Sequence, residues 1–420
     1  MSSRVPHAVS RRRFLKASSA AVGAIAIPYF VPQRAFGAND RPLAGFIGVR
    51  NQGTANLKLF ADYAAALCDV DEKVLGEAVT LAGKLGANVT TYHDYRKLLE
   101  NKDLDVIVIT TPDHWHARQM IDACAAGKHV YCEKPLGLTI AEGRKMVDAA
   151  RKYNRVVQTG SQQRSYDNFR FACQQVRSGA IGKVREVHVG IPKVNFKGPA
   201  VADSSPPPEL DYEFWLGPAP DRPYNVNRVH YNFRFFWDYS GGQMTNFGAH
   251  HIDIGQWGLA ADDTGPIEIE GTAEYHPEHW YEVPMRSRTT LRYANGVVMT
   301  VGQDQEDIKG GTRFIGTDGE IHVERGKLSG TPDEVKKYVL NKKDDGRATH
   351  RDNFLACIRS GERPTCDVEI GHRSATVCHL ANNALRLGRK IQWDPQAEQI
   401  TGDSEAAAMV DRPHRAPWTI

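Results

Sequence analysis

The sequence lacks several features that would assign it to a specialised class of protein. No stretch reaches the roughly 18 consecutive apolar residues expected of a membrane-spanning helix. It contains no internal repeat, no low-complexity tract and no Lys/Arg-rich stripe of the kind that favours nucleic acid as the main partner. Its 420 residues are 41% hydrophobic and 25% charged, which excludes a disordered or fibrous chain. By length, we expect two to three globular domains.

Cysteine is scarce and follows no pattern. The seven cysteines are an odd number, are scattered along the chain and include no C-x-x-C pair. This spacing is not typical of a disulfide framework or of a zinc site. We therefore expect mostly buried thiols.

Basic residues are concentrated at the amino terminus. The first 37 positions hold six basic residues and no acidic ones, and their removal leaves 47 basic against 50 acidic residues. The segment 10–16 (SRRRFLK) precedes an apolar, small-residue run at 17–31 and the sequence AFGA at 35–38. This order predicts a secretory signal over residues 1–38 and leaves no stable membrane span after processing.

Paired arginines followed by Phe-Leu-Lys resemble the twin-arginine export signal. An ordinary export signal that happens to contain Arg11 and Arg12 is the alternative. The resemblance implies the twin-arginine export machinery as a partner and a periplasmic destination. That machinery exports folded proteins, and a redox enzyme sent to such a compartment would need to carry its cofactor tightly bound.

Short apolar segments alternate with amphipathic segments over residues 41–162. The apolar segments, expected to be strands, are 43–49, 64–70, 105–110, 129–132 and 155–159. The amphipathic segments, expected to be helices, are 72–85, 95–100, 117–126 and 139–153, the last beginning with a capping-box pattern. This alternation predicts an α/β domain built on a Rossmann-type, doubly wound parallel sheet.

The turn after the first expected strand reads Gly48-Val49-Arg50-Asn51-Gln52-Gly53, which is the dinucleotide fingerprint with arginine at its middle glycine. Asp69 follows the second strand 21 residues after Gly48, close to the spacing of the acid that binds the ribose hydroxyls. Turn, spacing and alternation together predict NAD binding, although the turn alone also fits an ordinary strand-to-helix connection. Arg50 and Lys73 leave NADP possible.

The segments 110–116 (TTPDHWH) and 125–135 (AAGKHVYCEKP) resemble the glucose–fructose oxidoreductase, inositol dehydrogenase and MocA family. The family's Glu-Lys-Pro signature matches 133–135, and its Asp-x-x-x-His-x-x-Asp stretch falls on 246–253 with asparagine first. The segment 353–395 is similar to the family's carboxyl-terminal region. The resemblance covers the chain from about Pro42 to its end.

The resemblance implies hydride transfer, with His250 as the base and Lys134 as the group that polarises the reacting oxygen. An aspartate at position 246 would orient the imidazole and stabilise its protonated form, whereas Asn246 can only orient it. The residues we expect to contact the cofactor are Gly48, Arg50, Asn51, Gln52, Gly53, Asp69, Thr111, Pro112, His114, His116, Glu133 and Lys134. Those expected to contact substrate are Gln163, Arg164, Arg234, Trp237, Asn246 and Asp253. His114, His116, His250, His251 and Asp253 offer ligand atoms for zinc, but their spacing lacks a zinc pattern, so no metal is expected.

Residues 163–420 change character towards longer strands and polar loops. The strands expected there are 184–191, 267–275, 289–293, 297–301 and 319–323. The resemblance implies an α+β domain with a large open, mainly antiparallel sheet that binds substrate and mediates a homodimer or homotetramer. The segment 350–395 is expected to be helical and to pack near the first domain. The aromatic run 231–239 fits a hydrophobic core strand or a sugar-binding surface equally well.

The sequence therefore predicts an exported NAD(P)-dependent oxidoreductase acting on a sugar, cyclitol or glycoside hydroxyl. An alternative keeps the cofactor without net redox: hydride is removed, a neighbouring bond is cleaved or epimerised, and hydride is returned. A non-catalytic binding protein with the same fold is a third possibility, disfavoured by the presence of both Lys134 and His250.

Overall fold

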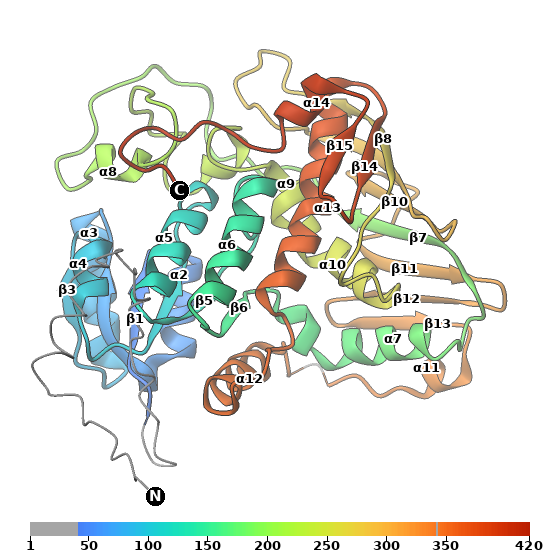
Figure 1. The fold of residues 1–420 in the computed structure, drawn as a ribbon, viewed down its shortest axis with the longest axis horizontal. Helices are drawn as coiled ribbons and strands as arrows, with labels where there is room; N and C mark the ends of the chain where they lie inside the picture. Colours follow the sequence, from blue (N-terminus) through green and yellow to red (C-terminus); the bar gives the residue numbers. More distant parts are fainter. Residues whose placement is uncertain (1–40, 342) are drawn as a thin grey trace, which may run out of the picture. The chain divides into compact units, whose positions relative to one another are not determined.

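A computed structural model describes residues 41–341 and 343–420 (Figure 1). The predicted signal segment lies outside the described residues. Within them, no helix is both long and apolar enough to cross a membrane. All seven cysteines are free and buried, which confirms the expectation of buried thiols.

The first sheet has six parallel strands in the order β3-β2-β1-β4-β5-β6. Its strands are β1 (Ala44–Ile47), β2 (Ala64–Cys68), β3 (Thr90–Tyr92), β4 (Val106–Ile109), β5 (His129–Cys132) and β6 (Val157–Thr159). The strand order reverses between β1 and β4, where doubly wound sheets form their ligand crevice. Five of these strands match the predicted segments. β3 went unpredicted because its three residues, two of them exposed threonines, carry no apolar pattern.

The helices of this half are α2 (Gln52–Leu59), α3 (Glu72–Lys84), α4 (Tyr95–Glu100), α5 (Asp113–Ala125) and α6 (Ile140–Lys152), with a 3₁₀ turn at Ala61–Tyr63. The predicted cap of α6 is present, since Thr139 Oγ1 accepts a hydrogen bond from the Glu142 N–H at 3.2 Å. The Glu142 carboxylate accepts from the Leu138 N–H. α5 begins at Asp113, four residues before the predicted start, so its first turn holds the His-Trp-His segment.

The second sheet has nine strands in the order β13-β12-β11-β7-β10-β9-β8-β14-β15 and is antiparallel except for the β7–β10 pair. Its strands are β7 (Val184–Ile191), β8 (Glu268–Glu274), β9 (Arg286–Arg292), β10 (Val298–Gln303), β11 (Gly311–Gly316), β12 (Glu320–Glu324), β13 (Lys327–Gly330), β14 (Ile391–Asp394) and β15 (Gln399–Thr401). This confirms the predicted fold class.

Helices cover one face of the second sheet (Figure 1). The helices of this half are α7 (Asp167–Arg177), α8 (Tyr212–Leu216), α9 (Gly242–Asn246), α10 (Gly248–Gly258), α11 (Asp333–Lys337), α12 (Arg347–Ser360), α13 (Val368–Leu387) and α14 (Ser404–Ala408), with 3₁₀ turns at Gln162–Ser165 and Asn232–Phe235. α7, α10 and α13 pack on the strands, and α13 also packs on α6. The segment 350–395 is therefore helical up to Leu387, but it ends in β14.

Of the two alternatives for residues 231–239, the core strand is wrong. These residues form the 3₁₀ turn and a loop, in which Phe235, Phe236 and Tyr239 are buried in a separate aromatic cluster with Trp215 and Tyr281. The run is apolar because it fills this cluster beside the sheet, and apolar character alone does not distinguish the two cases.

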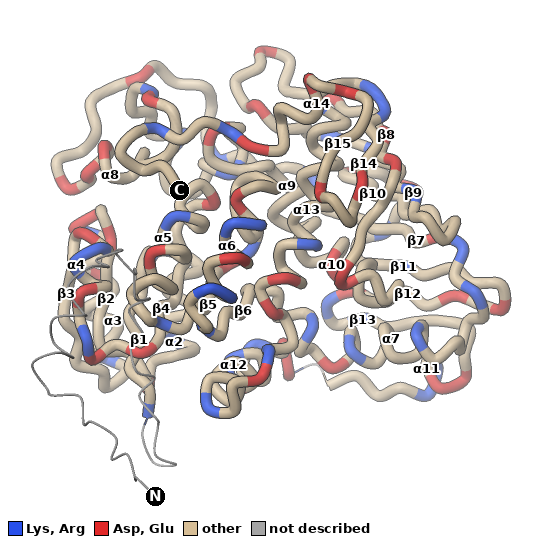
Figure 2. The backbone as a smooth tube through the Cα atoms, viewed as in Figure 1, with Lys and Arg blue, Asp and Glu red and all other residues tan. Residues whose placement is uncertain are grey.

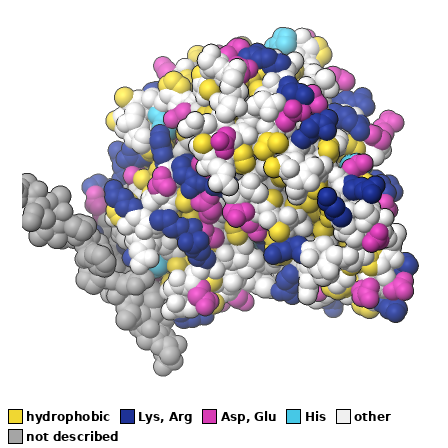
Figure 3. Space-filling model, turned by 45° about the vertical axis from the view of Figure 1, so that its right-hand side comes forward, with side chains coloured by type: hydrophobic (Ala, Val, Ile, Leu, Met, Phe, Trp, Pro, Cys, Tyr) yellow, Lys and Arg dark blue, Asp and Glu magenta, His cyan; other side chains and the backbone are white. Residues whose placement is uncertain are grey.

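Charges of both signs are interspersed along the described chain (Figure 2). The same mixture covers the surface turned forward in Figure 3, with hydrophobic side chains between the charged ones. On the second sheet many of these charges are paired: Arg292 lies 3.2 Å from Glu268, and Lys390 lies 2.8 Å from the same carboxylate. Such exposed pairs contribute little to stability individually.

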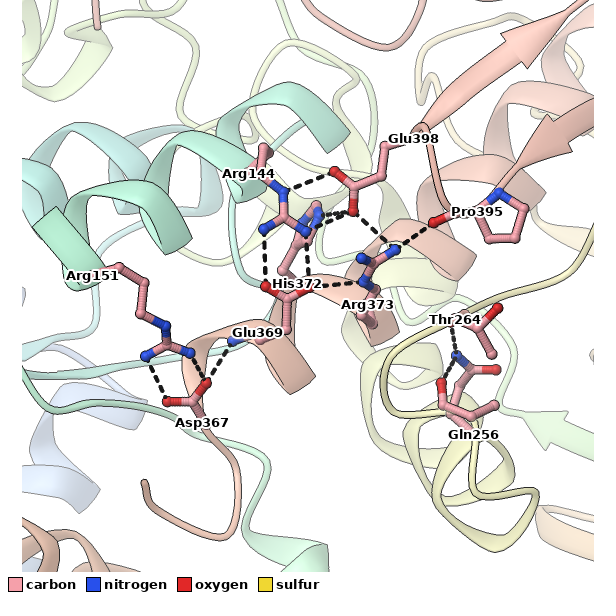
Figure 4. A network of polar contacts seen from close by, with 11 residues as sticks. Arg144, Arg151, Gln256, Thr264, Asp367, Glu369, His372, Arg373, Pro395 and Glu398 are labelled. Atoms are coloured by element: carbon pink, nitrogen blue, oxygen red, sulfur yellow. Dashed lines mark hydrogen bonds and ion pairs between the residues drawn. The ribbon is translucent and has the colours of Figure 1, made fainter. Parts of the chain in front are cut away.

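An ion-pair network joins α6 of the first half to α13 and the β14–β15 turn (Figure 4). The Arg144 guanidinium lies 2.8 Å from Glu369 and 2.7 Å from Glu398, and His372 Nε2 lies 2.8 Å from Glu398. A Cβ at Gly143 would lie 2.4 Å from His372 Nδ1, so glycine permits this close approach of the helices. The network therefore fixes one half of the molecule against the other.

Arg144→Gln should lower the free energy of unfolding by about 1–3 kcal/mol, because it removes one of the two arginines shared by Glu369 and Glu398 and leaves Arg373 alone with these half-buried carboxylates. Burial opposes ionisation of Glu369, but hydrogen bonds from Arg144 and Arg373 outweigh it and lower its pKa from 4.5 to about 2. The stability that this depressed pKa contributes is present above about pH 4.5 and is lost as pH falls towards 2.

Urea unfolding of the wild type and of Arg144→Gln between pH 2 and 7 measures both effects. Arg363→Gln removes an exposed arginine without an ion pair and serves as the control. Equal stability of Arg144→Gln and the control at neutral pH would contradict the role of the network.

Candidate active site

One cavity of about 320 Å³ lies at the carboxyl ends of β1, β2, β4 and β5. Its walls come from the turns that follow these strands and from the second half of the chain. The second half contributes chiefly the segment 230–250, together with Arg325 and Arg347. Both halves of the molecule are therefore needed to form the cavity.

The turn after β1 fits the cradle of a dinucleotide pyrophosphate. Gly48 has a φ of 80°, and a Cβ there would lie 2.9 Å from the Thr110 carbonyl carbon. A Cβ at Gly53 would lie 2.2 Å from the Gly48 carbonyl oxygen. Both positions therefore require glycine. No side chain caps the start of α2, which leaves this helix end available to an anionic group.

Arg50, which replaces the middle glycine of the fingerprint, does not block this cradle. It is exposed and lines both the main cavity and a second hollow beside Lys73 and Glu77. The arginine thus lies at the rim of the crevice. Asn51 and Gln52 line the cavity next to it, as predicted for cofactor contacts.

Asp69 follows β2 and lines the cavity. One of its oxygens accepts the Val49 N–H at 2.9 Å, and the other accepts the Asp71 N–H at 3.1 Å. Burial raises the pKa of Asp69 to about 6 in spite of these hydrogen bonds. The carboxylate is held in place, and each oxygen retains a lone pair for a hydroxyl donor.

The turns after β4 and β5 are fastened to each other. His116 lies with Nε2 2.9 Å from the Thr111 carbonyl and Nδ1 2.8 Å from the Pro135 carbonyl. Thr111 also donates its hydroxyl to Gln119 at 2.7 Å. Because Thr111, Pro112 and His116 all line the cavity, this histidine supports its wall.

Glu133 is buried at the end of β5 and lines the cavity. The Asn56 amide donates to its carboxylate at 3.0 Å and the Gln52 amide at 3.3 Å. A Cβ at Gly160, just after β6, would lie 2.8 Å from the same carboxylate, so this position requires glycine. These contacts link β5 to α2, the helix of the cofactor cradle.

Lys134 reaches across the cavity to the second half. Its Nζ donates to Asn246 Oδ1 at 2.8 Å and to the Asn246 carbonyl at 3.2 Å. Asn246 in turn donates its amide to Gln243 at 2.9 Å, which fixes the orientation of the amide. Burial lowers the pKa of Lys134, against the attraction of Glu133 and Asp113. The expectation that Asn246 orients His250 is wrong, since its oxygen is taken by Lys134.

His250 lines the same cavity from α10. Its buried Nδ1 has no hydrogen-bond partner within the described residues. Burial lowers the pKa of His250 well below 6.5, and the nearby Lys134 and Arg325 charges lower it further. The imidazole is therefore neutral at pH 7 and can accept a proton.

Arg164 and Asp253 were predicted to contact substrate, but they do not line the cavity. They form a fully buried ion pair with Nη2–Oδ1 at 2.8 Å, which Asp262 and Ser374 complete. Each group is satisfied by the other, so the structure gives them a packing role.

Three other predicted residues also lie behind the cavity wall. His114 contacts the Trp215 carbonyl at 3.0 Å, and Gln163 accepts a hydrogen bond from Arg325 at 2.9 Å. The ring of Trp237 lies between the guanidinium groups of Arg386 and Arg412. The sequence neighbours of His114 and Gln163, namely Asp113, Trp115 and Gln162, line the cavity instead. No group of three or more potential ligands in the described part of the chain is arranged to hold a metal ion.

Sequence reasoning missed several residues that line the cavity, namely Asp113, Trp215, His230, Phe233, Phe247, Arg325 and Arg347. Asp113 lies inside the recognised 110–116 segment and could have been included. Arg325 and Arg347 come from a hairpin turn and a helix start far along the chain, and no local pattern marks them.

Comparison with known proteins gives a consistent result. Residues 44–161 match a family model described as "Oxidoreductase family, NAD-binding Rossmann fold", and residues 185–420 match "Oxidoreductase family, C-terminal alpha/beta domain". The chain is 24% identical over 371 residues to a myo-inositol 2-dehydrogenase of Thermotoga maritima, covering 83% of this chain and 98% of that enzyme.

Two further similarities are limited, the first in its length and the second in its sequence identity. A glycosyl hydrolase family 109 protein of Shewanella pealeana is 34% identical over 122 residues, which is 27% of each protein. A levoglucosan dehydrogenase in complex with NADH and levoglucosan has a TM-score of 0.64 at 17% identity, covering 84% of this chain and 99% of that one. This last likeness concerns the fold.

We expect NAD to bind more tightly than NADP, because the Asp69 carboxylate would repel a 2′-phosphate. Asp69→Asn should reduce the ratio of NAD affinity to NADP affinity by about tenfold, which corresponds to about 1.4 kcal/mol. Ribose hydroxyls that donate to the carboxylate favour its charged form. NAD affinity should therefore weaken as pH falls through the Asp69 pKa of about 6.

Fluorescence titrations with NADH and NADPH between pH 5 and 8 test this expectation. The exposed Asp103→Asn serves as the control for a changed net charge. Equal affinity of the wild type for the two cofactors would contradict the assignment of Asp69.

Proposed function

The chain belongs to the glucose–fructose oxidoreductase, inositol dehydrogenase and MocA family of NAD-binding oxidoreductases, and on this basis we propose that it oxidises a secondary hydroxyl of a sugar, cyclitol or glycoside. The observation that carries the proposal is the meeting of Lys134 and His250, from opposite halves, on one cavity that also contains the dinucleotide cradle. A relative named as an inositol dehydrogenase supports the substrate class.

Bound NAD supplies a hydride acceptor for the carbinol carbon. The neutral His250 accepts the hydroxyl proton, so that a carbonyl, a reduced cofactor and a protonated histidine result. Lys134 donates a hydrogen bond to the reacting oxygen and stabilises its developing negative charge. Its contact with Asn246 aims the ammonium into the cavity before substrate arrives. Asn246 also lines the cavity, and the second N–H of its amide can donate to a substrate hydroxyl.

Tight retention of the cofactor is part of the proposal, and the segment 193–241 supports it. This segment crosses the end of β2: the Glu72 N–H donates to the Glu209 carbonyl and the Asp211 N–H to the Val70 carbonyl, each at 2.9 Å. His230 lies 3.1 Å from Asp71 and lines the cavity. The adenosine end of the cradle is therefore covered by the chain, and dissociation requires this segment to move.

The same enclosure favours a second candidate function, in which hydride is removed, a glycoside bond is cleaved by elimination, and hydride is returned. A retained cofactor suits such a cycle because it needs no exchange between turnovers. The similarity of 122 residues to a glycosyl hydrolase family 109 protein supports this candidate.

Lys134→Ala tests the proposed function. The mature protein is purified, checked for the absorbance of reduced nicotinamide, and mixed with a panel of sugars, cyclitols and glycosides. Wild-type protein should form NADH in a single turnover. Lys134→Ala should retain the cofactor but lose at least about 100-fold in rate, because the charge that stabilises the oxygen is gone.

Exposed Lys152→Ala is the matched control. Release of a sugar from a glycoside with no net change in cofactor would identify the second candidate. Unchanged activity of Lys134→Ala would remove this lysine from the mechanism. Absence of both cofactor and sugar binding would leave only a non-catalytic protein with the same fold.

We also propose that residues 1–38 direct export by the twin-arginine route to a periplasmic compartment. Replacing Arg11 and Arg12 together by lysine should leave the folded protein in the cytoplasm, because that route reads the arginine pair. Cell fractionation measures this, with Arg13→Lys as the control. Continued export of the double variant would indicate an ordinary secretory signal.

A homodimer or homotetramer is proposed from the family resemblance. The face of the second sheet that no helix covers is the surface offered for subunit contact. Charges on this face, such as Arg292 and Glu268, are already paired with each other. A subunit contact could therefore cover them without leaving a single buried charge unpaired.

A further inference from the structure

The cavity is lined by cationic side chains that form few ion pairs with the described residues. Lys134, Arg234, Arg325 and Arg347 all line it. Arg347 is paired with the exposed Asp345 at 3.2 Å, but Lys134, Arg234 and Arg325 have no ion pair within the described residues.

Arg325 is held by neutral groups. It lies at the turn between β12 and β13, exposed at the edge of the cavity, and its Nε donates to Gln163 Oε1 at 2.9 Å. Gln163 is itself buried, and the Arg325 guanidinium lies 5.5 Å from the ring centre of Phe247. The side chain is thus oriented while the two terminal nitrogens remain available to a ligand.

Arg234 is held in the same manner on another wall of the cavity. One terminal nitrogen donates to the Tyr231 carbonyl. The guanidinium lies 4.3 Å from the ring centre of Tyr231 and 5.0 Å from that of Phe233. Aromatic faces and a carbonyl fix the direction of the side chain but leave its charge uncompensated.

Two of the carboxylates that line the cavity, Glu133 and Asp113, have other donors. Glu133 accepts from the amides of Asn56 and Gln52, and Asp113 accepts from the Ser240 hydroxyl. Neither makes an ion pair with the arginines. The cations and carboxylates of the cavity are therefore kept apart. Cationic groups without counter-ions lower the stability of the free protein, and a bound anion would offset that loss.

We infer that the site takes a sugar-type substrate carrying an anionic group, a carboxylate or a phosphate, which Arg325 and Arg234 bind. The inference rests on the proposed function, because it specifies the substrate of the same cavity. Planar guanidinium groups donate two parallel hydrogen bonds to either anion, so both belong to the same recognition chemistry.

The electrostatics of the reacting groups agree with this inference. Burial lowers the pKa of both Lys134 and His250, and in both cases the Arg325 charge adds to the effect. A bound anion would oppose the arginine charge and raise both pKa values. The histidine would then become a stronger base only when substrate is present.

The experiment measures the binding of matched sugars to the cofactor-loaded protein by titration calorimetry. The probes are D-glucose, D-glucuronate and D-glucose 6-phosphate, with the corresponding galacto and manno sets, at constant ionic strength. In at least one set an anionic sugar should bind tenfold or more tightly than its neutral partner. The two anionic arms decide between carboxylate and phosphate.

Arg325→Gln and Arg234→Gln should each reduce this preference for the anionic sugar to less than about threefold, because the charged two-pronged donor is lost. Arg325→Lys should restore part of it, since the charge remains but the two-pronged geometry is lost. Arg363→Gln controls for net charge, and thermal unfolding confirms that each variant is folded.

The inference is overturned if no anionic sugar binds more tightly than its neutral partner, absence of binding included. It is also overturned if Arg325→Gln and Arg234→Gln weaken NADH binding by the same factor as sugar binding, since the arginines would then serve the cofactor. NADH formation from a neutral sugar would in either case leave the proposed function intact.

Discussion

The hydrogen bond between Lys134 and Asn246 is the contact on which the site depends. Lys134 lies in the turn after β5 of the first sheet, and Asn246 precedes the helix that carries His250. The bond joins two residues 112 positions apart, and both Lys134 and His250 line one cavity. Elsewhere the Arg144 network keeps the two halves in the register that this bond requires. The position of His250 relative to Lys134 therefore depends on how the two halves of the chain pack against each other.

How far the sequence predicts this site depends on how local each part is. Gly48, Asp69 and Lys134 follow strands, and parallel strands bring their carboxyl ends to one edge, so their meeting follows from the strand pattern. His250 required the family resemblance, because no local rule connects α10 to that edge. Arg325 comes from a hairpin turn whose position depends on the whole second sheet, and turn sequences do not encode what they face.

The incorrect predictions share a physical cause. Arg164, Asp253 and Trp237 are polar or aromatic residues near recognised motifs, and such residues suit a ligand site. In the folded chain Arg164 and Asp253 satisfy each other in the core, and two arginines enclose Trp237. A sequence gives the chemistry of a side chain but not its partner, and a buried charge has a partner far more often than a ligand.

Because charged side chains inside a fold usually have a partner, the absence of an ion pair at Arg234 and Arg325 within the described residues indicates a ligand-binding role. Arg164 forms an ion pair with Asp253, and Arg144 forms ion pairs with two glutamates. Arg234 and Arg325, in contrast, are oriented by a carbonyl, an amide and aromatic rings. The fold places carboxylates in this cavity and still keeps them from these cations. A charge held in a fixed direction without a counter-ion is a preorganised binding group, and its cost to stability is recovered when an anion arrives. Because the Arg325 charge helps to lower the pKa of His250, an anion bound to Arg325 would couple substrate binding to proton transfer.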